Sequence, residues 1–177
     1  TKNIQAKLSY EKAYRLPTND ELFGDEDLEA GKSNLRPENS NNLNFNISYS
    51  NSFGKNTVYL EGGVIYRDTK DYIKRGIGKH GALEYGIFEN HGHVKTKGYN
   101  IGMRYGYSDW FSVGGTFNSI DTRDYERYVA GGTQQESMHY KVRLPNIPYL
   151  FANADATITL KNVFTKGSRL NLIYDAF

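Results

Sequence analysis

Residues 43–66, LNFNISYSNSFGKNTVYLEGGVIY, decide the fold of this chain. Apolar and polar side chains alternate on both sides of a short polar join, NSFGK, at residues 51–55. A period of two residues is the signature of a β-strand whose two faces meet different surroundings. The stretch therefore predicts two antiparallel strands connected by a short turn.

The same alternation recurs along the chain and predicts seven strands in all. Apolar side chains fall on one face of each strand and Asn, Ser, Thr, Gly or charged residues on the other, with exceptions at Ile65, Phe151 and Ile173. The expected strands span residues 3–11, 43–50, 58–67, 99–107, 111–118, 150–160 and 169–177.

The joins between these strands alternate in length. Three are short, at residues 51–55, 108–109 and 161–167. The other three are long and rich in Gly, Asn and charge, at residues 14–39, 71–95 and 122–147. An outer-membrane β-barrel sorts its connections in this way, with short periplasmic turns and longer extracellular loops. We therefore expect an all-β, antiparallel, up-and-down transmembrane β-barrel, with the long joins outside the cell.

Composition agrees with strands and excludes several other classes of protein. The chain has 15 Tyr and 9 Phe, and aromatic residues suit strands. No apolar run is long enough for a transmembrane helix, and the absence of Cys rules out disulfides and thiolate metal sites. The net charge is only +2 with mixed signs, so the sequence does not point to nucleic acid. A soluble β-sandwich remains an alternative, because its strands alternate too.

Two boxes after the first expected strand are more specific than the alternation. The first is Tyr14-Arg15-Leu16-Pro17 with Glu21-Leu22, and the second is Asn34-Leu35-Arg36-Pro37-Glu38. The chain thus resembles the TonB-dependent outer-membrane receptors, whose barrels carry similar boxes. The stretch Arg-Leu-Pro-Asn-Ile-Pro at residues 143–148 resembles the receptors of the Bacteroidetes in particular. Leu16 replaces the usual Ala and Arg36 the usual Lys. Pro17 and Pro37 fix φ and lack an amide proton, so each marks a place where the chain leaves the sheet.

The resemblance implies a fold and a function. Residues 1–177 would form about seven strands of a 22-stranded barrel, with the plug domain and the C-terminal strands absent from the chain. The whole receptor would import a siderophore, haem or cobalamin, driven by the TonB complex acting through the plug. It would lie in the bacterial outer membrane, in contact with lipid and lipopolysaccharide. A structural or adhesive barrel without transport is the alternative function.

Candidate ligand contacts lie in the expected outer loops. Arg15 ends the first strand and could reach the carboxylate of Glu38, and the other candidates are Arg75, His80, Tyr85, His91 and His93. The His91-Gly92-His93 triplet would place both imidazoles on one face of a strand. No nucleophile elbow, P-loop or His-Glu-x-x-His motif is present, so we predict no enzyme activity, no metal site and no cofactor.

Overall fold

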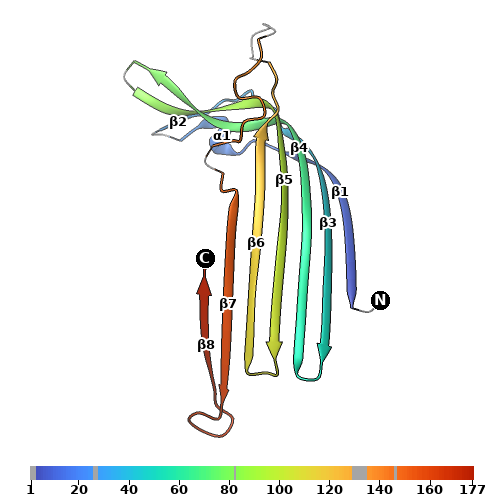
Figure 1. Ribbon diagram of the computed structural model, residues 1–177. Coiled ribbons are helices and arrows are strands. Elements are labelled where there is room, and N and C mark those ends of the chain that lie inside the picture. The colour runs from blue at the N-terminus through green and yellow to red at the C-terminus, as the bar shows by residue number, and fades with distance from the viewer. Residues whose placement is uncertain (1–2, 26–27, 82, 129–134, 146) are drawn as a thin grey trace.

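The computed structural model describes residues 3–25, 28–81, 83–128, 135–145 and 147–177 (Figure 1). It contains one short helix and strands that mostly belong to a single antiparallel sheet. The elements are β1 (Ile4–Arg15), α1 (Asn19–Phe23), β2 (Glu29–Ala30), β3 (Glu38–Phe53), β4 (Asn56–His80), β5 (Leu83–Tyr107), β6 (Phe111–Asp124), β7 (Leu150–Lys161) and β8 (Arg169–Ala176).

The sheet is an up-and-down wall. Its strands follow the order β1-β3-β4-β5-β6-β7-β8, and β2 lies apart, paired in parallel with β5. Figure 1 shows the short turns at one end of the wall and the long connections at the other. The seven predicted strands are confirmed as β1 and β3 to β8, and the sheet is an open part of a barrel. Within the described residues, no second sheet covers either face, which rules out the sandwich.

One face of the wall is apolar and uncovered. Near the middle of the sheet Phe45 is 40% exposed, Val64 53% and Ile101 56%. The opposite face carries polar residues such as Asn44, and a polar inner face with an apolar outer one is the arrangement of a membrane barrel. Lipid therefore takes the place that a second layer holds in a sandwich. No helix in the described part of the chain is long and apolar enough to span a bilayer.

The prediction of a long loop at 71–95 was wrong. β4 and β5 instead form one hairpin that is paired from Asn56↔Tyr107 to His80↔Leu83, with its turn at Gly81. In Figure 1 its outer half turns sideways across the extracellular end of the wall, close to α1 and β2. In the outer half, charged and polar residues such as Lys74 and Arg75 occupy both faces of the hairpin, so the apolar alternation that predicted the other strands is lost.

The hairpin bends at Asp71. This residue has φ 54°, a left-handed conformation that Asp tolerates better than most side chains. Pairing has the same register on both sides of the bend, since Lys70 lies opposite His93 and Tyr72 opposite His91. The bend therefore redirects the hairpin without shifting its strands.

Candidate functional site

The inner face of the wall has a hollow near its extracellular end. Its volume is about 590 Å³, and it lies between β1, β3, β4, β5 and β6. Its polar lining includes Arg15, Glu38, Asn42, Arg67, Tyr72 and Thr122. The Arg67 Nε donates a hydrogen bond of 2.8 Å to the Oδ1 of Asn42, which is buried. In this hollow a polar solute could meet side chains from several strands at once.

Arg15 ties two carboxylates together at the rim of this hollow. Its Nη2 donates to Glu38 Oε1 at 2.9 Å, and its Nη1 donates to both Glu21 oxygens at 3.0 and 3.1 Å. The same Glu38 oxygen accepts the backbone N–H of Ile73 at 2.8 Å. Arg15 thus reaches Glu38 as the sequence suggested, but its guanidinium also joins the end of β1 to α1.

The short helix α1 holds Glu21 in place. Thr18 caps the helix, its side chain accepting the amide of Glu21, while the Glu21 carboxylate accepts the amide of Thr18 at 2.8 Å. Burial alone would raise the pKa of Glu21. The hydrogen bonds from Arg15 and Thr18, together with the positive charge of Arg15, outweigh it and hold this pKa below its ordinary value. Glu21 therefore stays ionised at neutral pH.

The second box anchors the long first connection to the bend of the hairpin. Arg36 Nε donates to Asp71 Oδ1 at 3.0 Å. The side-chain oxygen of Asn90 accepts a hydrogen bond from the backbone N–H of Arg36 at 2.8 Å. The side-chain nitrogen of Asn90 donates to the carbonyl oxygen of Arg36 at 2.8 Å and to that of Asp71 at 2.9 Å. These contacts are those of a structural rim that holds a loop, which is what we expect of the proline-containing boxes.

The two histidines of the His91-Gly92-His93 triplet lie in β5, not in a loop. Their side chains pair with residues of the two different strands that flank β5. His91 Nε2 lies 2.7 Å from Asp124 Oδ2 at the end of β6, and His93 pairs with Asp68 on β4. The imidazoles therefore hold β5 to its two neighbours and do not converge on one point. Within the described part of the chain, no group of three or more His, Cys, Asp or Glu side chains could hold a metal.

The remaining candidates lie on the outer half of the hairpin. Arg75 pairs with Glu29 at 2.6 Å, next to the short parallel pairing of β2 with β5. The ring of Tyr85 lies against Gly78, where a methyl group would come within 2.7 Å of it. His80 ends β4, so its prediction as a loop residue was wrong. The six predicted residues thus occupy the lumenal rim, the bend and the outer hairpin, and the structure does not bring them into one site.

Sequence reasoning missed Asn90 and Asp124, the partners that fix the bend. The charged residues on either side of Gly81 did indicate a hairpin in the sequence. Lys74 pairs with Glu89 at 3.3 Å and Lys79 with Glu84 at 2.6 Å, directly across the two strands. Opposite charges placed symmetrically around Gly81 are typical of a hairpin, because facing residues stabilise paired strands.

Comparison with known proteins agrees with this architecture. The family model described as "TonB dependent receptor-like, beta-barrel" matches residues 1–175. The chain belongs to this family. It is therefore part of a barrel wall in the bacterial outer membrane, and the resemblance seen in the two boxes is confirmed.

Structural comparison adds a neighbour of the same fold. The copper transporter OprC matches with a TM-score of 0.59 and 18% sequence identity, over 88% of this chain and 21% of that one. This TonB-dependent receptor chain thus spans about a fifth of the length of the neighbour. No curated protein matches it.

Proposed function

We propose that the chain is part of the wall of a receptor that imports a scarce ligand through the outer membrane, energised by TonB through a plug domain. Membership of the receptor family over residues 1–175 is the observation that carries this proposal. The polar inner face and its hollow of about 590 Å³ fit a passage for a polar solute. Siderophores, haem and cobalamin are the candidate ligands, and the structural neighbour adds copper to the set to be tested.

The test is an uptake measurement in the parent bacterium. The receptor gene is deleted, and accumulation of labelled ferric siderophore, haem, cobalamin and copper is compared with that of the wild type and of a strain lacking TonB. We expect the uptake of one ligand to fall equally in the two deletion strains. A plasmid copy of the receptor should restore this uptake only in cells that have TonB. Unchanged uptake of every candidate would contradict the proposal.

We further propose that ligand contacts come from the predicted residues, Arg15, Arg75, His80, Tyr85, His91 and His93. Arg75 and Tyr85 are the most informative of these, because both lie in the part of the hairpin beyond the bend at Asp71, at the extracellular end of the wall. Arg75→Gln and Tyr85→Ala should raise the ligand concentration needed for half-maximal uptake. Lys55→Gln, in the periplasmic turn, is the matched control and should leave that concentration unchanged. If all three variants need the same ligand concentration for half-maximal uptake, the hairpin does not contact the ligand.

A further inference from the structure

A cationic hollow lies on the outer, lipid-facing side of the wall, away from the lumen. Its volume is about 250 Å³, and its lining is Lys95, Lys97, Arg123, Lys141, Tyr125 and Asp121. Lys95 and Lys97 share the face of β5 that continues into the exposed apolar residues Ile101 and Met103. Their neighbour Thr96 points the other way, into the lumenal hollow. The cations therefore stand just above the apolar band, at its extracellular edge.

The carboxylates nearby leave this hollow with an excess of positive charge. Asp121 is bound by Arg123 at 2.7 Å and by Arg143 at 2.8 Å. The carboxylate of Asp68 pairs with both His93 and Lys95, and the Lys95 Nζ lies 3.6 Å from the Asp68 Oδ2. Within the described residues, neither Lys97 nor Lys141 has a carboxylate within ion-pair distance, and both are exposed. Two ammonium groups without a carboxylate partner thus face the same hollow, and that of Lys141 lies 5.1 Å from the centre of the Tyr140 ring.

The backbone holds this arrangement together. Residues 141–144, in the later part of the third long connection, run back along the end of β6. There Asp124 N donates to Val142 O at 3.0 Å and Leu144 N donates to Thr122 O at 2.9 Å. Arg143 lies opposite Arg123 in this ladder, and Arg123 Nη1 donates to the carbonyl oxygen of Lys141 at 3.1 Å. Lys141 is therefore fixed beside β6 and is not carried on a free loop.

An apolar hollow adjoins the cationic one on the same face. It measures about 280 Å³, and Lys97 lines both hollows. The side chains that shape it from β3 and β4 are Leu43, Phe45, Val64 and Tyr66. A group with a negative charge above and a hydrocarbon chain below would fill the two hollows together. That is the chemistry of a membrane lipid with a phosphorylated headgroup.

We propose that this paired hollow is a binding site for a phosphate group of an outer-leaflet glycolipid, lipopolysaccharide, with an acyl chain against Phe45 and Val64. The cations supply the charge complement, since Lys and Arg at a membrane surface attract anionic headgroups. A soluble anion needs only the cationic half of the site and has no use for the apolar half. The site lies outside the import passage, so it is independent of the imported ligand.

The experiment uses the whole receptor, purified in detergent and freed of co-purified lipid. Binding is measured for lipopolysaccharide, for the same lipid with its lipid A phosphates removed, and for inorganic phosphate. The test variant is Lys97→Gln with Lys141→Gln. The control is Lys55→Gln with Lys166→Gln, which removes the same charge from the periplasmic turns. Lys97→Arg with Lys141→Arg keeps the charge, and retained heat-modifiability on unboiled gels reports that each barrel is folded.

We expect the wild type, the control and the Arg variant to bind phosphorylated lipid about tenfold or more tightly than the dephosphorylated form. The Gln variant should bind both forms equally weakly. Undiminished binding of phosphorylated lipid by a folded Gln variant would overturn the proposal. Inorganic phosphate that displaces the lipid at equal concentration would overturn it too, by assigning the cations to a soluble anion. If the Gln variant does not fold, Lys97→Gln alone replaces it, with the same outcomes.

Discussion

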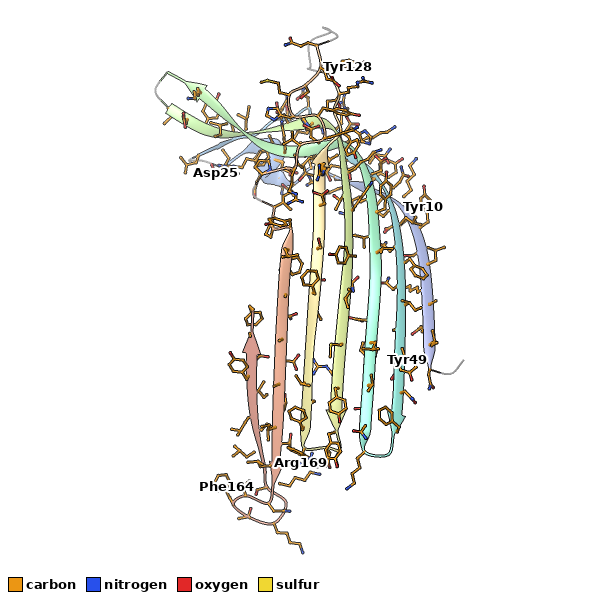
Figure 2. All side chains as sticks on the ribbon, in the orientation of Figure 1. Tyr10, Asp25, Tyr49, Tyr128, Phe164 and Arg169 are labelled. Carbon is orange, nitrogen blue, oxygen red and sulfur yellow. The ribbon has the colours of Figure 1, made fainter. Side chains whose placement is uncertain are left out.

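Two regions of this molecule are built on the same antiparallel ladder but are stabilised in different ways. The wall is formed by β1, β3, β6, β7, β8 and the parts of β4 and β5 between the short turns and the bend at Asp71. It has apolar side chains on one face and polar ones on the other. The cap, formed by residues 15–25, 28–38, 71–81 and 83–93, is held by ion pairs, a helix cap and side-chain amides. Figure 2 shows side chains crowded together at this end of the molecule. Lipid on one face of the wall favours alternation, whereas the hairpin of the cap carries charged and polar side chains on both faces.

The largest effect should come from a charge placed on the lipid face of the wall. Phe45→Arg puts a guanidinium in the middle of β3, and such a charge near the bilayer midplane costs about 2–4 kcal/mol. The neighbouring Asn46→Arg points into the lumen and should change stability by about 0.5 kcal/mol or less. Denaturant unfolding of the whole receptor in lipid vesicles measures both. Equal losses for the two variants would mean that this face of β3 does not meet lipid.

In the cap, the loss of a shared ion pair should have a smaller effect. Arg15→Ala leaves Glu21 and Glu38 without their guanidinium, although their side chains are only 13% and 12% exposed. We expect a local loss of about 1–2 kcal/mol, moderated because Arg15 itself is 41% exposed. Hydrogen exchange should speed up at the amides of α1 and Ile73, while the wall stays protected. The control is Arg127→Ala, whose pair with Glu136 is 3.4 Å long and well exposed, and it should cost well under about 1 kcal/mol.

The smallest effect should follow from pH. The pKa of Glu21 is lower in the folded cap than its ordinary value of 4.5. Its contribution is therefore complete at neutral pH, where the carboxylate is ionised in both states, and is lost as the pH falls below 4.5 through the lowered pKa. Exchange at the α1 amides, corrected for intrinsic rates, should rise over that range and fall back on return to neutral pH. Glu21→Gln should remove this dependence, and a variant that kept it would assign the effect to another group.

The same contrast explains how much could be predicted from the sequence. Strands with one face in lipid were recognised because Leu43, Phe45 and Ile47 alternate with Asn and Ser. The loop assigned to 71–95 was wrong, because charged and polar residues on both faces of the hairpin interrupt that period. Its charges, Lys74 with Glu89 and Lys79 with Glu84, carried the missing information.

The contacts at the candidate site were harder to predict than the strands. Arg15 and Glu38 could be linked because each belongs to a box at a strand end. The pairing of His91 with Asp124 depends on how β5 and β6 are aligned and on where the hairpin bends. Neither the strand alignment nor the position of the bend can be predicted from the order of apolar and polar residues. The two histidines were therefore assigned to a loop and expected to contact one ligand together.

The bend at Asp71 also has a mechanical consequence. The hairpin beyond it extends for about ten residues on each strand, or about 30 Å, and is supported at its base and again where β2 pairs with Gly86 and Ile87. A load applied to its tip produces a torque at the base. There Asn90 is hydrogen-bonded to Arg36, and His91 and His93 pair with Asp124 and Asp68. Those carboxylates belong to β6 and β4. A load on the outer hairpin is therefore transmitted to the strands on both sides of β5.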